Sequence, residues 1–266
     1  MIEQVAGALV LDAAKGVAQK GLAGGLAKIH NERGLLSLLV WRPNGKARIS
    51  VSALLRIQRT DGRFAIIRNL HRPEDFSAIG GVFKCRPVSG LRQLDRFEFV
   101  PENRLAGEDV TNDVRGYTKR KYVSKILAWS ANEQSAVETG PECLRREIRE
   151  ELTEEFDILE KGFPIENLTF SYSHQCLKIS HCVQELMPLT QAQLFRVYDL
   201  GDNRLSIDLF DQIAARGGEN ILWVTRNDIL EGRCGEQNKP IGAPVELFIR
   251  NTIHRQTSAP PNRRPG

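Results

Sequence analysis

The pattern of apolar and polar positions predicts a β-rich region in the first third of the chain. Ile49–Ile57 and Phe64–Leu70 are apolar runs of strand length, separated by Asp61 and Gly62. An Asp-Gly pair favours a hairpin turn because both central residues tolerate positive φ. Leu35–Trp41 is a further apolar run that stops at a Pro-Asn-Gly turn sequence. This region therefore predicts three strands, the last two paired as a hairpin.

Two amphipathic helices are predicted in the middle of the chain, after a strand at Ser77–Lys84. The first is Thr118–Trp129, whose apolar side carries Val123, Ile126, Leu127 and Ser130 at helical spacing. The second is Pro141–Phe156, with an apolar stripe at Leu144, Ile148 and Leu152. Proline suits the first turn of a helix, where its missing N–H costs nothing. Both helices are expected to bury one side.

The last third of the chain alternates strand-like runs with short helical segments. The predicted strands are Leu168–Tyr172, Cys176–Val183, Leu194–Leu200 and Ile221–Val224, and the predicted helices are Asn227–Leu230 and Pro244–Ile253. Strands lie on both sides of a central helix in the sequence. That order favours a mixed α/β (α+β) sandwich over regular βαβ winding.

The two ends of the chain differ in character from the middle. Residues 1–34 contain an Ala- and Gly-rich amphipathic helix, Val5–Ile29, whose four charged residues make it a poor membrane span. It either packs on the domain or contacts a membrane surface or a partner. Residues 255–266 are Pro-rich, polar and basic, which predicts a disordered tail. The main domain is therefore expected to be residues 35–254.

Composition narrows the class of protein without identifying it. The net charge of +4 permits an anionic ligand but is too small for a dedicated nucleic-acid binder. The five cysteines form no CxxC pair, and no signal peptide is visible, so a cytoplasmic location is expected. His174, Cys176, His181 and Cys182 fit no familiar zinc spacing, and alternation along a strand explains them more simply.

The densest chemistry lies in the run Arg146-Glu147-Ile148-Arg149-Glu150-Glu151. On a helix, Glu147, Glu150 and Glu151 occupy positions i, i+3 and i+4, so the three carboxylates share one face. Their mutual repulsion requires an arginine or a divalent metal nearby, and magnesium prefers oxygen ligands and substrate phosphates. The alternative is a solvated helix with ordinary ion pairs between Arg146 and its glutamate neighbours.

This run resembles the helix of the Nudix family, whose box reads G-x5-E-x7-R-E-U-x-E-E-x-G-U, with U a bulky apolar residue. Glu138 stands eight positions before Arg146, as the box requires, and Gly80-Gly81 resembles the glycine strand that precedes it. The resemblance implies an α/β/α sandwich with a mixed sheet. It also implies Mg²⁺ or Mn²⁺ held by Glu147, Glu150 and Glu151, with Glu138 and Arg146 completing the catalytic set.

Three departures from the box bear on activity. The box is split, because residues 85–135 stand as an insertion between Gly81 and Glu138, and Asn132 occupies the contiguous glycine position. Thr153 replaces the later glycine, and Glu154 replaces an apolar residue. All the metal-binding carboxylates are retained. Metal binding is therefore the safer expectation, and hydrolysis depends on the parts that differ.

The split box resembles most closely the SMODS-associated Nudix group. That resemblance implies a sensor or effector of a nucleotide second messenger in bacterial antiphage defence. The predicted ligand-binding residues are Gly80, Gly81, Lys119, Arg120 and Lys121, although a solvated basic face is the alternative for the last three. Two other functions stay open: an active Mg²⁺-dependent hydrolase of nucleoside diphosphate-linked substrates, and a non-catalytic scaffold for a partner protein.

Overall fold

The computed structural model describes residues 43–70, 72–86, 89–102, 112–131, 136–184, 187–235 and 237–249. The predicted N-terminal helix, the run Leu35–Trp41 and the predicted tail lie outside these residues. Among the helices that the structure describes, none has the length and apolar content needed to cross a bilayer.

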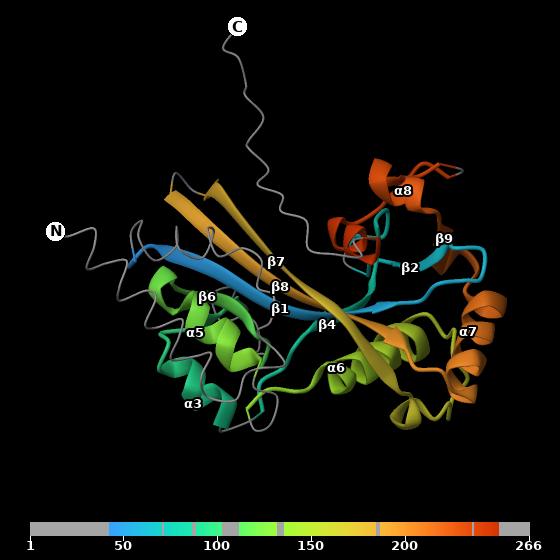
Figure 1. Ribbon diagram of the computed structural model, residues 1–266, viewed down its shortest axis with the longest axis horizontal. Coiled ribbons are helices and arrows are strands. Elements are labelled where there is room, and N and C mark those ends of the chain that lie inside the picture. The colour runs from blue at the N-terminus through green and yellow to red at the C-terminus, as the bar shows by residue number, and fades with distance from the viewer. Residues whose placement is uncertain are drawn as a thin grey trace, which may run out of the picture.

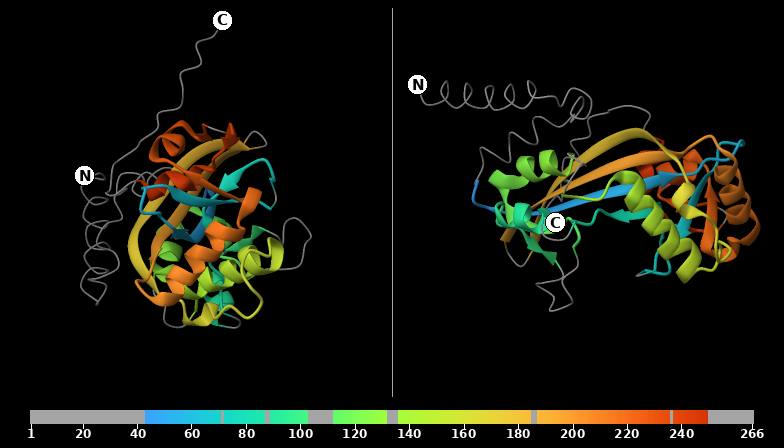
Figure 2. Two further views of the ribbon diagram at one scale, coloured as in Figure 1. Left: turned by 90° about the vertical axis from the view of Figure 1, so that its right-hand side faces the viewer. Right: turned by 90° about the horizontal axis from the view of Figure 1, so that it is seen from below.

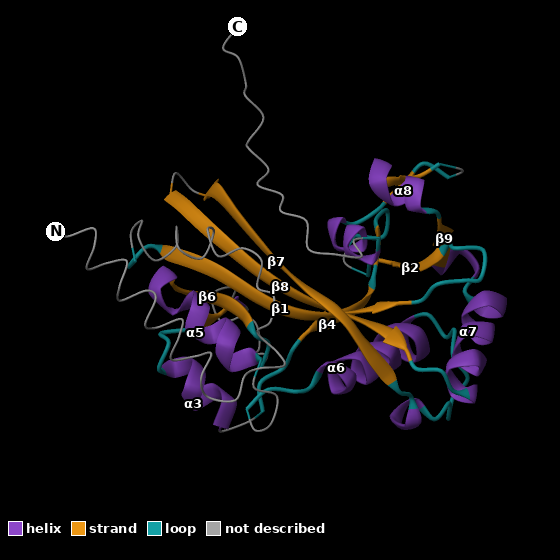
Figure 3. Ribbon diagram, viewed as in Figure 1, coloured by secondary structure: helices purple, strands orange, loops and turns teal. Residues whose placement is uncertain are grey.

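Strands and helices are both spread along the described chain (Figure 3). The strands are β1 (Lys46–Arg56), β2 (Phe64–Arg68), β3 (Phe76–Ser77), β4 (Ile79–Val82), β5 (Val100–Pro101), β6 (Arg115–Lys119), β7 (Phe170–Gln184), β8 (Met187–Leu200), β9 (Ile221–Val224), β10 (Arg233–Cys234) and β11 (Lys239–Pro240). The α-helices are α3 (Ser89–Asp95), α5 (Arg120–Ser130), α6 (Gly140–Glu147), α7 (Arg204–Arg216) and α8 (Arg226–Glu231). A π-helix, η1 (Ile148–Glu155), continues α6, and short 3₁₀ helices are η2 (Ile165–Asn167), η3 (Gly218–Asn220) and η4 (Ala243–Phe248).

A mixed sheet centred on β1 organises the molecule (Figure 1). Its strand order is β5-β6-β1-β8-β7, and β4 also pairs with β1. On one edge β1 runs parallel to β8, and on the other it is antiparallel to β6 and β4 in turn. Strands β6 and β4 therefore lie one after the other along the same edge of β1. A smaller antiparallel sheet has the order β3-β2-β9.

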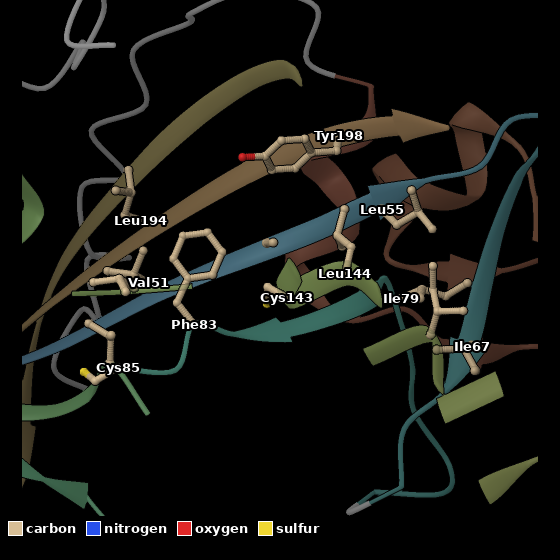
Figure 4. Close-up of a cluster of buried hydrophobic side chains, with 14 of the residues drawn as sticks. Val51, Leu55, Ile67, Ile79, Phe83, Cys85, Cys143, Leu144, Leu194 and Tyr198 are labelled. Carbon is tan, nitrogen blue, oxygen red and sulfur yellow. The ribbon is translucent and has the colours of Figure 1, made fainter. Parts of the chain in front are cut away.

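Side chains on opposite faces of β1 point into two separate hydrophobic cores. Ala47, Ile49, Val51, Ala53 and Leu55 are fully buried on the side of β1 that carries the larger core. Figure 4 shows part of this core, with Val51 and Leu55 beside Phe83 and Leu144. Leu54 points to the opposite side, where a second core forms.

Helices cover both sides of the sheets. Figure 2 shows helices on both sides of the long strands. Apolar residues of α5, α6, η1 and α7 belong to the larger core, and those of α8 and η4 belong to the second core together with β2 and β9. The predicted stripes are buried: Leu144, Ile148 and Leu152 are fully inaccessible, and Val123, Ile126, Leu127 and Ser130 line the inner side of α5. The predicted α/β/α sandwich with a mixed sheet is confirmed.

The predicted hairpin is correct at its turn and at the first residue pairs beside it. Arg59 N–H donates to the Arg63 carbonyl at 2.8 Å, Gly62 takes φ of 85°, and Ala65 N–H donates to the Ile57 carbonyl at 3.0 Å. Further along, the two strands separate, since β1 joins the large sheet while β2 pairs with β3 and β9. Their pairing is set by partners distant in the sequence, which the local pattern does not encode.

The last third also differs in part from the prediction. The three runs between residues 168 and 200 form two long antiparallel strands, β7 and β8, with an irregularity between Tyr172 and His174. Of the expected helix at Pro244–Ile253, the described residues form a 3₁₀ helix over Ala243–Phe248, and residues 250–253 lie outside the described part of the chain. Helix α7 was not predicted, although its Asn203 cap and buried Leu209 and Ile213 carried the signal. The predictions for β9 and α8 hold within one residue.

The insertion leaves and re-enters the domain at one point. Cys85 pairs with Val137, Arg86 N–H donates to the Ala136 carbonyl at 2.9 Å, and Glu138 N–H donates to the Lys84 carbonyl at 3.0 Å. Between these ends lie α3, β5, β6 and α5. Strand β6 takes the first two residues of the helix predicted at Thr118–Trp129, which begins instead at Arg120.

Candidate metal centre

A capping box fixes where the glutamate helix begins. The Thr139 hydroxyl accepts from Glu142 N–H at 3.3 Å, and Thr139 N–H donates to the Glu142 carboxylate at 2.7 Å. Pro141 stands in the first turn, as predicted. Because the start is fixed, so is the phase of the helix: Cys143 and Leu144 enter the core, and Arg146 and Glu147 turn toward β4.

The second half of the predicted helix is a π-helix. From Ile148 to Glu155 the turns are wider than in α-helix, and Glu150 and Glu151 lie in the first of them. The predicted extent, Pro141–Phe156, is correct within a residue or so, but the prediction of α-helix throughout is wrong. Segments of π-helix are uncommon and often occur at functional sites, because they redirect side chains relative to the preceding turn.

Gly80 and Gly81 allow the closest approach between β4 and the glutamates. A Cβ atom at Gly81 would overlap the Glu147 carboxylate. Gly80 has φ of 139°, and its N–H donates to Glu151 Oε2 at 3.4 Å. The two glycines were predicted as ligand-binding residues, and the structure places them directly against two of the predicted metal ligands.

Arg146 holds the carboxylates together. Its guanidinium donates to Glu138 Oε1 at 2.7 Å, to Glu150 Oε2 at 3.3 Å, to Glu147, and to the Val82 carbonyl at 2.9 Å. The side chains of Arg146, Glu138 and Glu147 are only 17%, 14% and 12% exposed. Burial opposes the charge of Arg146, but the hydrogen bond that its guanidinium donates to Glu138 and the negative charge of Glu147 raise its pKa above the ordinary value. These contacts are those of a residue that orients carboxylates.

The split box is reassembled in space. Because the insertion closes on itself at Lys84 and Glu138, the first glutamate of the box lies beside the strand that carries its glycines. Lys84 N–H donates to Glu138 Oε1 at 2.7 Å, and the same carboxylate receives Arg146. The structure therefore brings together Gly80, Gly81, Glu138, Arg146, Glu147, Glu150 and Glu151, as the sequence predicted.

The surroundings of the cluster destabilise the ionised form of two of its carboxylates. Burial raises the pKa of Glu147, and it raises the pKa of Glu151 well above the ordinary value. The charge of Glu147 adds to the effect on Glu151, which Gly80 N–H and Arg146 only partly offset. A divalent cation at this face would stabilise both anions.

The residues fit such a cation by their chemistry. The donors are all carboxylate oxygens, which suit Mg²⁺ or Mn²⁺ rather than a softer metal. Within the part of the chain that the structure describes, no three His, Cys, Asp or Glu side chains are gathered as metal ligands. The carboxylates turn instead to Arg146, Gly80 and Lys84. Glu147, Glu150 and Glu151 would hold the metal, with Glu150 as the exposed member.

The basic residues of the insertion lie elsewhere. Lys119 is paired across the sheet with Lys46, whereas Gly81 is paired with Ala53, seven residues further along β1. At the rise of a strand, this separation is roughly 23 Å. Lys119 forms an ion pair with Glu98 at 2.6 Å, and Arg120 is buried. Lys119, Arg120 and Lys121 were predicted to bind ligand together with Gly80 and Gly81, and the structure does not bring these two groups together.

The third basic residue also interacts locally. Lys121 Nζ lies 4.9 Å from the centre of the Tyr122 ring, and the Tyr122 hydroxyl donates to Glu98 at 3.1 Å.

A different cation, Lys84, was not predicted from the sequence. Its Nζ lies 3.6 Å from Glu150 Oε1. The signal that could have found it is a lysine three positions after Gly81, just past the end of the glycine strand.

Most of the chain matches a known protein family. Residues 46–249 match the model of the SMODS-associated NUDIX domain. The searches of curated proteins and of solved structures returned no match. The family match spans the large sheet, the insertion, the glutamate helix and the second core. The chain therefore belongs to the family of SMODS-associated NUDIX domains.

Proposed function

We propose that this domain binds a nucleotide through a divalent metal, and that it acts as a sensor or effector of a nucleotide second messenger. The observation that carries the proposal is the cluster of Glu147, Glu150 and Glu151 against Gly80-Gly81, oriented by Arg146. Buried carboxylates with raised pKa values are the groups that gain most from a bound cation.

Each residue has a distinct role in this proposal. Glu150 and Glu151 bind Mg²⁺ or Mn²⁺ with Glu147. Arg146, held by Glu138, orients Glu147 and Glu150, and Gly80 N–H orients Glu151. A hard cation that keeps open positions takes phosphate oxygens into its shell. When bound, the metal neutralises charge on a diphosphate. The ligand is therefore expected to carry linked phosphates.

The biological setting is inferred from the family. The domain is described as SMODS-associated, which supports a partner synthetase that makes a nucleotide signal in bacterial antiphage defence. A cytoplasmic location follows from that setting. An Mg²⁺-dependent hydrolase is the second candidate, because Glu138, Arg146 and the three glutamates of the box meet in one cluster.

The test is removal of metal-binding charge without change of shape. The double variant Glu150→Gln/Glu151→Gln should lose at least about 100-fold in Mg²⁺ affinity by calorimetric titration, since even residues that only support metal ligands cost 10- to 100-fold. The matched control is Glu154→Gln/Glu155→Gln, on the same helix but exposed, which should bind as wild type does.

Thermal melting then separates the candidate functions. Nucleotides that bind the folded protein with Mg²⁺ should raise its Tm, and the double variant should show no rise. Unchanged Mg²⁺ affinity in the double variant would contradict the metal assignment. Metal-dependent release of phosphate or nucleoside monophosphate would replace the sensor with the hydrolase, and absence of any nucleotide binding would favour a scaffold.

A further inference from the structure

Two cations reach the glutamate face, and they are held very differently. Arg146 is largely buried and bonds to Glu138, to Glu150 and to the Val82 carbonyl. Lys84 touches the face through one ion pair, with its Nζ 3.6 Å from Glu150. The lysine and glutamate side chains are 41% and 43% exposed. Arg146 is fixed by its surroundings, while the Lys84 ammonium is not.

We propose that Lys84 is a phosphate-contacting residue of the ligand site, and that metal binding at Glu150 releases its ammonium to the ligand. The inference rests on the proposed function and adds to it the residue that recognises phosphate beside the metal. Gly80, Gly81 and Arg146 are not free for that task, because they contact the glutamates themselves.

The backbone of Lys84 is anchored where such a residue is needed. Its N–H donates to Glu138 Oε1 at 2.7 Å, its carbonyl accepts from Glu138 N–H at 3.0 Å, and it pairs with Asp113 across the start of the insertion. The side chain therefore begins at a fixed point next to the cluster. Only the flexible methylene chain has to move for the ammonium to change partner.

The charges favour that exchange. A solvent-exposed lysine–glutamate pair is weak, because water screens it and both side chains lose freedom in making it. A divalent cation on Glu150 removes the attraction and repels the ammonium. A diphosphate bound to that cation offers new negative oxygens, and lysine binds phosphate as a compact point charge.

Neighbouring cations around the helix have other partners. Arg86 bonds to Glu142 at 2.9 Å, just outside the cluster. Arg145 donates to the Leu168 carbonyl at 2.8 Å, and Arg149 pairs with Glu166. These contacts direct all three guanidinium groups away from Glu150. Among these residues Lys84 is the one whose charge meets the exposed member of the predicted metal set.

The test uses Mg²⁺ alone and inorganic pyrophosphate with Mg²⁺, each titrated calorimetrically into the full chain. Lys84→Met should keep or improve Mg²⁺ affinity, because a competing cation is gone. It should lower pyrophosphate affinity about tenfold, as expected for the loss of one charge-assisted contact. Lys84→Arg should recover most of that loss, since it keeps the charge.

Lys239→Met is the matched control, because Lys239 also pairs with a glutamate at 3.6 Å and is 36% exposed, but lies on β11. It should leave both affinities unchanged. Wild-type pyrophosphate affinity in Lys84→Met would overturn the role of Lys84 while leaving the metal site standing. A parallel loss of Mg²⁺ affinity would also overturn it, by making Lys84 part of the support for the metal. If wild type binds no Mg²⁺, the proposed function itself fails.

Discussion

The glutamate helix (α6-η1) and the basic helix of the insertion (α5) have similar buried faces but differ in the surroundings of their charged residues. Both α6-η1 and α5 contribute buried stripes to the larger core. On the glutamate helix, charged residues at the edge of the stripe are themselves largely buried and share one arginine. At the start of the basic helix, Lys119 in the capping position and Lys121 in the first turn interact locally with Glu98 and Tyr122 near the surface.

The comparison shows that charge density in a sequence does not identify a site by itself. Both segments carry several charges within a few residues, and both admitted a solvated interpretation. What distinguishes them is desolvation: close to β4, charges interact strongly because water is excluded, whereas exposed pairs contribute little. The predictions below test this difference.

Removal of Arg146 should have the largest effect. Arg146→Ala leaves Glu138 and Glu147 as largely buried anions without their cation, which should cost about 3–5 kcal/mol of unfolding free energy. Arg146→Lys should be intermediate, because it keeps the charge but lacks the planar fork. Urea unfolding of the Mg²⁺-free protein measures both.

Lys119→Ala, at the position that caps the basic helix, provides the contrast. Its ion pair with Glu98 lies in solvent, so the unfolding free energy should be nearly unchanged. Similar losses for Arg146→Ala and Lys119→Ala would remove the distinction between the two helices.

The contributions of Glu151, in the glutamate helix, and of Glu102, in the insertion, to the free energy of unfolding should change with pH in opposite directions. Burial raises the pKa of Glu151 well above 4.5, so its contribution to folding is largest below pH 4.5 and is lost as pH rises through the folded-state pKa. Arg48 lowers the pKa of Glu102 by hydrogen bonding. The contribution of Glu102 is therefore present above pH 4.5 and lost as pH falls through its folded-state pKa.

Two isosteric variants isolate these contributions. With a chelator present to remove metal, Glu151→Gln should reduce the fall of the unfolding free energy as pH rises above 4.5. Glu102→Gln should reduce the rise of the unfolding free energy with pH below 4.5. Urea titrations across pH 3–8 give both slopes. The electrostatic account of the glutamate cluster fails if the slope above pH 4.5 is the same in wild type and Glu151→Gln.

The smallest effect is expected from the exposed lysines of the insertion. Lys119→Ala/Lys121→Ala should lower nucleotide affinity less than about threefold. The difference should vanish in high salt, because salt screens interactions between exposed charges that are more than about 8 Å apart at physiological ionic strength. Arg120 is left intact because it is buried. Affinity is measured calorimetrically with Mg²⁺ present and at two salt concentrations. A loss of tenfold or more that persists in salt would mean that the ligand reaches from the glutamates to the insertion.

Local features of the sequence predicted the fold well where the relevant partners are close in the chain. The buried stripe at Leu144, Ile148 and Leu152 follows from helical spacing alone, and the turn at Gly62 follows from its dipeptide. The change to π-helix at Ile148 was not predictable from that stripe, because the same spacing suits an α-helix.

Features that depend on distant pairing were predicted only through family resemblance, or not at all. The contact between Glu138 and the glycine strand depends on how the insertion closes. The position of Lys119 depends on its register against β1, which no local pattern specifies. Lys84 follows the glycine strand in the sequence, but its contact with Glu150 depends on the closure of the insertion and was therefore not predicted.

The pairing of β1 with β8 has a consequence for how the chain folds. Arg56 and Asp199, joined by a hydrogen bond at the end of this parallel pair, are 143 positions apart. Contacts of such separation close late, because the chain loses much entropy before it gains their energy. During synthesis, more than half of the protein must be made after β1 begins to emerge before β8, its parallel neighbour, is complete. The elements that precede β8 in the chain and cover the apolar residues of β1 are β4, β6, the helices of the insertion and the glutamate helix.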